Sequence, residues 1–269
     1  MKILLGFKPT RILGADYSGI VTEIGSEVSD FKVGDSVFGL LHAYKGGAYA
    51  EFLKVKEKLT CLKPKNLNFE EAASIPLAAL TSYQALFHEG KIKQGYHIMI
   101  NGCTGGVGIA GVQIAKAFSC TVTGVCSTKN IEIAKKVGVD HVIDYTKDDV
   151  LKDKNTYDIF LDAVANQSFF NAKETLKPGG TYITTLPGFH AFVLAPFINT
   201  ISSKKLRKVL IAPSKKRAKD LKVLKEMIES GKFKPVIEKV YPIEQIREAH
   251  TRSETERVVG KIVIRGFPQ

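Results

Sequence analysis

The chain has 269 residues, of which 44% are hydrophobic and 25% are charged. This composition is that of a globular protein and excludes a disordered, collagen-like or coiled-coil chain. Lys and Arg number 39 against 27 Asp and Glu, so the formal net charge is +12, which favours anionic ligands without identifying them. No apolar run approaches the roughly 18 residues that a membrane-spanning helix needs, and the first residues show no secretory signal pattern. We therefore expect a soluble, cytoplasmic protein with no integral membrane segment.

The four cysteines, at positions 61, 103, 120 and 126, form no C-x-x-C pair and no spacing that suits a zinc lobe or a disulfide framework. We expect them to be reduced and mostly buried. No two of the six histidines have helical ligand spacing, so the sequence offers no candidate metal site.

Up to about residue 70 the chain is typical of β structure, because short apolar stretches are separated by glycine-rich turns. Apolar residues at helical spacing then predict a helix over 70–87, which Pro76 must kink or interrupt. From residue 97 strands and helices alternate, which favours a parallel sheet covered on both faces. Strands are expected at 97–100, 121–126, 141–143, 157–163, 181–185, 209–211 and 261–264, and helices at 107–118, 130–137, 167–176 and 215–230.

Two segments in the second half of the chain keep alternatives open. Residues 189–197 are apolar and predict either a lid over a bound ligand or a core segment. A basic run follows, which could bind nucleic acid or a membrane surface. No aromatic residues interleave with its charges, so we favour a solvated basic face and expect no nucleic-acid partner. The run comprises Lys204, Lys205, Arg207, Lys208, Lys215, Lys216 and Arg217.

A glycine-rich turn, residues 102–108, lies between a predicted strand and a predicted helix. In that setting Gly105 lets the backbone approach a pyrophosphate, Gly108 lets the helix pack closely on the strand, and the helix N-terminus supplies N–H donors. Cys103 replaces the first glycine of the usual G-x-G-x-x-G pattern. The alternative is a loop shaped only by chain reversal. The residues expected to bind the dinucleotide here are Thr104, Gly105, Gly106 and Val107.

The choice of cofactor depends on the end of the next strand, about 20 residues further on, where an acidic residue would bind the ribose of NAD. No Asp or Glu occurs between Gly102 and Ile131, and the strand is followed by Ser127, Thr128 and Lys129. A lysine attracts a 2′-phosphate that a carboxylate would repel, so the sequence predicts NADPH over NADH. Ser127 or Thr128 could also cap the next helix.

With these residues in place, the chain resembles the zinc-independent quinone oxidoreductase branch of the medium-chain dehydrogenase/reductase superfamily. The resemblance implies an α/β fold that combines a Rossmann doubly wound parallel sheet with a GroES-like β-rich catalytic domain. It places the catalytic domain at 1–76, the NADPH-binding domain at 77–214 and a return to the catalytic domain at 215–269, with the substrate between the domains. The matching stretches are 12–21, 31–39, 46–51, 102–108, 142–145, 176–180 and 260–263.

The resemblance also implies site residues. Thr81 is expected near the nicotinamide ribose, and Ser127, Lys129 and Tyr145 around the adenosine end, although Tyr145 could equally be a core aromatic. Ala15 stands where zinc-dependent relatives carry a histidine ligand, which implies a metal-free mechanism. The implied reaction is hydride transfer from NADPH to a quinone or an α,β-unsaturated carbonyl. A homodimer joined through the strand at 209–211 is a further implication.

Family members carry additional N-terminal residues that open the catalytic domain and line the substrate site, whereas the stretch 12–21 is reached here almost at once. We therefore expect an incomplete GroES-like domain, and we assign no catalytic residue. A chain that binds NADPH without turning over a substrate is the alternative to an active reductase.

Overall fold

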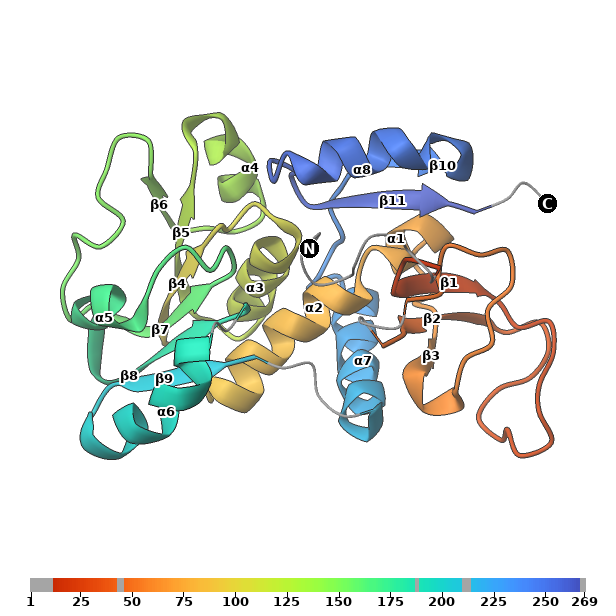
Figure 1. Ribbon diagram of the computed structural model, residues 1–269, viewed down its shortest axis with the longest axis horizontal. Helices are drawn as coiled ribbons and strands as arrows, with labels where there is room; N and C mark the ends of the chain where they lie inside the picture. The colour runs from red at the N-terminus through yellow and green to blue at the C-terminus, as the bar shows by residue number, and fades with distance from the viewer. Residues whose placement is uncertain (1–11, 43–45, 187–188, 210–213, 267–269) are drawn as a thin grey trace. The chain divides into compact units, whose positions relative to one another are not determined.

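The computed structural model describes residues 12–42, 46–186, 189–209 and 214–266 (Figure 1). Contacts divide the chain into two units. Unit 1 comprises residues 1–77, 213–229 and 235–269, and unit 2 comprises residues 78–212 and 230–234.

A six-stranded parallel sheet forms the centre of unit 2, with the strand order β6-β5-β4-β7-β8-β9. The chain runs outward from β4 in one direction and from β7 in the other, so right-handed crossovers send α3 and α4 to one face and α5 and α6 to the opposite face. The predicted doubly wound parallel sheet is confirmed. Its elements are β4 (His97–Asn101), α3 (Gly106–Ala117), β5 (Thr121–Cys126), α4 (Ile131–Lys136), β6 (His141–Asp144), β7 (Tyr157–Asp162), α5 (Phe169–Ala172), β8 (Leu176–Thr184), α6 (Phe189–Ile201) and β9 (Lys205–Lys208).

The central strands are apolar without interruption because both faces of the sheet are covered. Residues 98–100 of β4 and 159–161 of β7 are fully buried. β8 begins five residues before the predicted position, at Leu176. The pairing of β8 with β7 shifts its register between Tyr157 and Ile159. Gly179, in the added first part of β8, has a φ of +81°.

Among the described residues, the last strand of the sheet is β9, Lys205–Lys208, which pairs with β8 alone. It lies just before the predicted strand 209–211, of which only Val209 is described. Leu206 is buried while Arg207 is exposed, so this edge strand alternates and lacks the continuous apolar run that marks a central strand. Residues 210 and 211 lie outside the described residues, and a homodimer through this segment stays a prediction.

The helix predicted over 70–87 is interrupted at the expected place. α1 (Phe69–Ala73) ends shortly before Pro76, which begins α2 (Pro76–Tyr83), and a π-helical turn, η2 (Gln84–Glu89), continues it. α1 begins with a reciprocal cap, in which Asn68 Oδ1 accepts from the Glu71 N–H at 2.8 Å and Glu71 Oε2 accepts from the Asn68 N–H at 2.9 Å.

Unit 1 contains a three-stranded antiparallel sheet, β1-β2-β3, and a parallel pair, β10-β11. Asp16 on β1 accepts a hydrogen bond from the Leu77 N–H at 2.7 Å and lies 3.4 Å from Lys261 Nζ on β11. Burial raises the pKa of the Asp16 carboxyl, and the nearby lysine opposes that rise. The elements are β1 (Asp16–Ile20), β2 (Ser36–Leu40), β3 (Thr60–Leu62), α7 (Ser214–Glu229), β10 (Ile237–Pro242), α8 (Ile246–Glu254) and β11 (Lys261–Arg265), with short 3-10 turns η1 (Glu57–Leu59), η3 (Thr128–Asn130), η4 (Lys173–Thr175) and η5 (Ile243–Gln245) along the whole chain.

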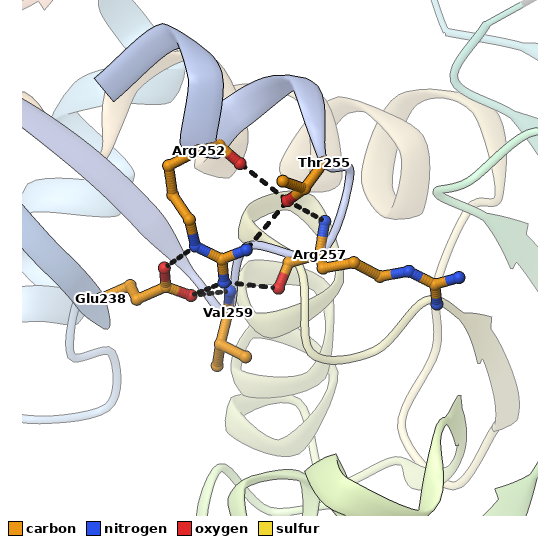
Figure 2. Close-up of polar contacts among 5 residues, drawn as sticks. All are labelled: Glu238, Arg252, Thr255, Arg257 and Val259. Carbon is orange, nitrogen blue, oxygen red and sulfur yellow. Dashed lines mark hydrogen bonds and ion pairs between the residues drawn. The ribbon is translucent and has the colours of Figure 1, made fainter. Parts of the chain in front are cut away.

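A polar cluster fixes the turn between α8 and β11 (Figure 2). Glu238 on β10 accepts from Arg252 Nε at 2.6 Å and from the Val259 N–H at 2.7 Å. The same guanidinium donates to the Arg257 carbonyl at 2.9 Å. The carboxylate therefore joins the end of α8 to the start of β11, around Glu256, whose φ is +55°.

Candidate dinucleotide-binding site

The glycine-rich turn follows β4 and reverses the direction of the chain beside the end of β5. Gly102 has a φ of +77°, in the left-handed region that favours glycine. The N–H groups of Gly102 and Cys103 both donate to the Val125 carbonyl, at 3.1 and 3.0 Å. A Cβ on Gly102 would also lie 2.3 Å from Val164 Cγ2, so the turn requires glycine at this position.

Close packing of α3 on the turn accounts for Gly108. A Cβ there would lie 2.1 Å from the Gly102 carbonyl oxygen and 2.7 Å from the Cα of Cys103. Backbone atoms cannot move aside as a flexible side chain can, so the helix reaches this position only with glycine.

Gly105 has a different environment. It is the N-cap residue of α3, with φ −81° and ψ 171°, which any residue can adopt. A Cβ there would meet only the Gly102 carbonyl oxygen, at an ordinary 3.7 Å, so the fold itself does not demand glycine. The N–H groups of the first helical turn have no intrahelical acceptor, and the N-cap residue, Gly105, gives them no side-chain hydrogen bond. Open space beside uncapped N–H donors is what a bound anion requires.

Thr104 connects the turn to the segment after β5. It is buried, and its Oγ1 accepts from Asn130 Nδ2 at 3.2 Å. Cys103 is fully buried, with its Sγ so close to Gly124 that a Cβ there would be 2.8 Å away. The small cysteine thus fits between the two strand ends.

Three of the predicted residues gather at the carboxyl ends of β5 and β6. Ser127 is buried and precedes η3, but it makes no capping hydrogen bond, so a capping role for this residue is not supported. Lys129 is exposed. Tyr145 donates its N–H to the Cys126 carbonyl at 3.1 Å and is 44% exposed, so the alternative of a core aromatic is excluded.

An acidic residue, Asp144, lies beside this group and was missed by the sequence analysis. Its Oδ2 accepts from Thr128 Oγ1 at 2.5 Å, and its Oδ1 accepts from the Thr146 N–H and hydroxyl at 3.0 and 2.7 Å. The hydrogen bond from Thr128, with those from Thr146, lowers the pKa of the Asp144 carboxyl. The carboxylate therefore stays ionised and holds the segment after β5 to the end of β6.

Thr81 lies on α2, close to the first turn of α3. Thr81 is buried, and the hydroxyl of its neighbour Ser82 donates to the Val107 carbonyl at 2.6 Å. A cofactor whose pyrophosphate rests on α3 would bring its nicotinamide half within reach of this helix.

The loop after β7 completes the site at the point where the strand order reverses, which is where α/β sheets bind ligands. Asp162, at the end of β7, is fully buried and accepts from Asn101 Nδ2 and from the Tyr182 hydroxyl, each at 2.9 Å. The N–H groups of Ala165 and Gln167 donate to the same carboxylate at 2.8 and 2.9 Å. This carboxylate shapes the loop beside the glycine-rich turn, and no spacing in the sequence pointed to it.

Comparison with known proteins agrees with this fold. Residues 2–65 match the family "Alcohol dehydrogenase GroES-like domain", and residues 137–264 match the family "Zinc-binding dehydrogenase". The 2-methylene-furan-3-one reductase of Solanum lycopersicum is 36% identical over 270 residues, which cover 95% of this chain and 63% of that protein. The chloroplast envelope quinone oxidoreductase homolog of Arabidopsis thaliana is 33% identical over 263 residues, covering 94% and 79%.

A solved structure, the quinone oxidoreductase from Coxiella burnetii, superposes with a TM-score of 0.83 at 28% identity and covers 94% of this chain and 78% of that one. The chain therefore belongs to the quinone oxidoreductase branch of the medium-chain dehydrogenase/reductase superfamily. The predictions of family and of fold class are confirmed. The chain spans about two thirds to four fifths of the length of the relatives named above.

The described residues contain no group of three or more His, Cys, Asp or Glu side chains placed to hold a metal ion. No helix among them combines the length and the apolar character needed to cross a membrane.

Proposed function

We propose that this chain binds NADPH at the glycine-rich turn and reduces a quinone or an α,β-unsaturated carbonyl by hydride transfer, without a metal. The observation that carries the proposal is the open space at Gly105 beside the uncapped first turn of α3. The names of the relatives, a furanone reductase and a quinone oxidoreductase, support the two substrate classes.

Each part of this cofactor, from the pyrophosphate to the adenosine and the nicotinamide ribose, would have its own residues in unit 2. The N–H groups of Gly106 and Val107 would donate to the pyrophosphate, aided by the positive end of the α3 dipole. Ser127 and Lys129 would bind the 2′-phosphate, and the half-exposed ring of Tyr145 would lie against the adenosine. Thr81 would orient the nicotinamide ribose.

The cofactor, when bound, supplies the hydride, and the protein supplies binding and orientation. The loop around Asp162 is held by five donors, so it presents a fixed surface at the switch point. A rigid loop of this kind limits the positions that a nicotinamide and its acceptor can take, which favours a productive geometry.

The test is a fluorescence titration of the purified chain with NADPH and with NADH. We expect tighter binding of NADPH, and we expect Lys129→Glu to weaken it by about tenfold or more while changing NADH affinity little. Lys136→Glu is the matched control, because Lys136 is an exposed lysine on the neighbouring α4. Equal affinity for both cofactors, unchanged in Lys129→Glu, would contradict the assignment of the 2′-phosphate site.

Turnover is tested separately by NADPH oxidation in the presence of a p-quinone or an enone, before and after dialysis against a metal chelator. We expect activity that the chelator leaves unchanged. Tight NADPH binding with no acceptor-dependent oxidation would favour a cofactor-binding protein without turnover.

A further inference from the structure

Two cysteines lie next to one another at the glycine-rich turn. Cys103 belongs to the turn that follows β4, and Cys126 is the last residue of β5, the strand that pairs with β4 (Figure 1). The Cys103 N–H donates to the Val125 carbonyl at 3.0 Å, which attaches the turn to β5 one residue before Cys126. Both cysteines are free thiols, and the two thiols form a hydrogen bond with one another.

Gly124 makes room for this pair of thiols. Gly124 and Cys126 are two residues apart on β5, so they share one face of the strand. A Cβ at position 124 would lie 2.8 Å from Cys103 Sγ and 2.9 Å from Cys103 Cβ. The Cys103 side chain therefore packs on the backbone of β5, in space that a side chain at position 124 would fill.

The hydrogen bond gives the two sulfur atoms different properties. The S–H of Cys103 donates to Cys126 and lowers the pKa of the Cys126 thiol, while burial and the charge of Asp144 oppose that change. The same hydrogen bond, together with burial, raises the pKa of the Cys103 thiol. Cys126 is 3% exposed and Cys103 is 0% exposed. Cys126 is therefore the thiol that ionises first and that a small oxidant reaches first.

We propose that Cys103 and Cys126 form a reversible disulfide when the chain meets a peroxide, and that this disulfide weakens dinucleotide binding at the turn. The Cys126 thiolate attacks one oxygen of hydrogen peroxide and the O–O bond breaks. Cys126 becomes a sulfenic acid, and the hydroxide that leaves takes up a proton to form water. The Cys103 sulfur then attacks the sulfenic sulfur, the S–O bond breaks, and a second water leaves. Two thiols thus lose two electrons and two protons, and one peroxide is reduced to two waters.

The effect on binding rests on the proposed function. A disulfide has an S–S distance of about 2.05 Å, shorter than the separation of two hydrogen-bonded thiols, so Cys103 must move toward Cys126. The start of α3 packs closely on Cys103, because a Cβ on Gly108 would lie 2.7 Å from the Cys103 Cα. Movement of Cys103 therefore also moves the N–H groups that open α3. An anion site that has lost its preorganised geometry binds more weakly.

The first measurement is the linkage itself. The folded full chain is treated with hydrogen peroxide, its remaining thiols are alkylated in denaturant, and the products are examined by mass spectrometry. We expect two of the four cysteines to remain unalkylated, peptide mapping to find Cys103 joined to Cys126, and dithiothreitol to restore both thiols. Cys126→Ala should form no disulfide, and Cys103→Ala should stop at a sulfenic acid that dimedone traps.

Cys120→Ala is the matched control, because Cys120 is also a buried cysteine of unit 2. Its Sγ donates to the Lys93 carbonyl at 3.3 Å, so its hydrogen-bond partner is backbone and not a thiol. This variant should form the disulfide as the parent chain does. Thermal unfolding checks that the three variants fold, and peptide mapping of the parent chain does not depend on them.

The second measurement is titration of the oxidised and the reduced chain with NADPH. We expect oxidation to raise the Kd about fivefold or more and dithiothreitol to reverse the change. Peroxide should leave the NADPH affinity of Cys126→Ala unaltered.

Four alkylated cysteines after peroxide, a linkage between other cysteines or between two chains, or an oxidised chain with the affinity of the reduced one would each overturn the proposal. A reduced chain that does not bind NADPH would refute the proposed function, and with it the effect on binding. The linkage would still be decided by the masses, so the two proposals fail separately.

Discussion

Alanine at two glycines of the same turn should have different effects: at Gly108 it should lower the stability of the fold, and at Gly105 it should weaken cofactor binding. Gly108→Ala places a Cβ 2.1 Å from a backbone oxygen, far inside ordinary contact distance. Overpacking against backbone costs about 3 kcal/mol. In a domain of this size each kcal/mol lowers the melting temperature by about 2–4 °C, so we expect a fall of about 6–12 °C.

Gly105→Ala should leave the folded chain almost unchanged. Alanine is a poorer N-cap residue by about 0.5–1 kcal/mol, but loss of glycine freedom in the unfolded chain offsets about 0.4–1 kcal/mol. The melting temperature should therefore stay within about 2 °C. The new methyl group would stand where the pyrophosphate is proposed to lie, so the Kd for NADPH should rise at least tenfold, or about 1.4 kcal/mol.

The assay is thermal unfolding of both variants without ligand, followed by titration of the folded protein with NADPH. The reasoning is refuted if Gly105→Ala binds NADPH with the parent affinity, because no ligand would then approach that backbone. Equal destabilisation by both substitutions would also refute it, since the geometry separates the two positions.

Two further predictions concern stability. Burial, with smaller contributions from His141 and Lys177, lowers the pKa of His97 below 6.5, so at this residue the unfolded chain binds a proton more readily than the folded chain. The free energy of unfolding should therefore fall as the pH drops through about 6.5 and level off below the pKa of the folded state. Urea unfolding of His97→Gln should lack this pH-dependent loss of stability. Tyr182→Phe removes a hydroxyl that donates to the buried Asp162 carboxylate and should cost about 1.5–3 kcal/mol in urea unfolding; a loss below about 0.5 kcal/mol would show that the other donors suffice.

The parallel sheet was predictable because its strands are buried on both faces. β5 has the predicted bounds, 121–126, since a continuous run of small and β-branched residues ends at the polar pair Ser127-Thr128. The break at Pro76 was predictable for a similarly local reason, because proline lacks the N–H that a continuous helix needs. In both cases the information lies within a few neighbouring residues.

The elements that were missed have weak local signals. α8 has nine residues and only Ala249 fully buried, so its apolar face is too narrow to stand out. β10 shows little burial beyond Tyr241 and ends in a proline. Its position depends on pairing with β11 and on Glu238, whose partners lie 14 and 21 residues away. Contacts with residues so far along the chain produce no periodic pattern of apolar residues in the sequence of the strand itself.

The charge around the proposed 2′-phosphate illustrates the same limit within the site. The fingerprint places the discriminating acid at the end of β5, and none is there, but the parallel register pairs Cys126 at that end with Asp144 on β6. A neighbouring strand thus brings a carboxylate to the same edge, where hydrogen bonds from Thr128 and Thr146 engage both of its oxygens and Lys147 Nζ lies 3.8 Å away. A 2′-phosphate at this edge would experience the sum of that screened charge and of Lys129. The preference for a cofactor with or without a 2′-phosphate would therefore depend on the charges at the ends of both β5 and β6. The residues that follow β5 alone do not determine it.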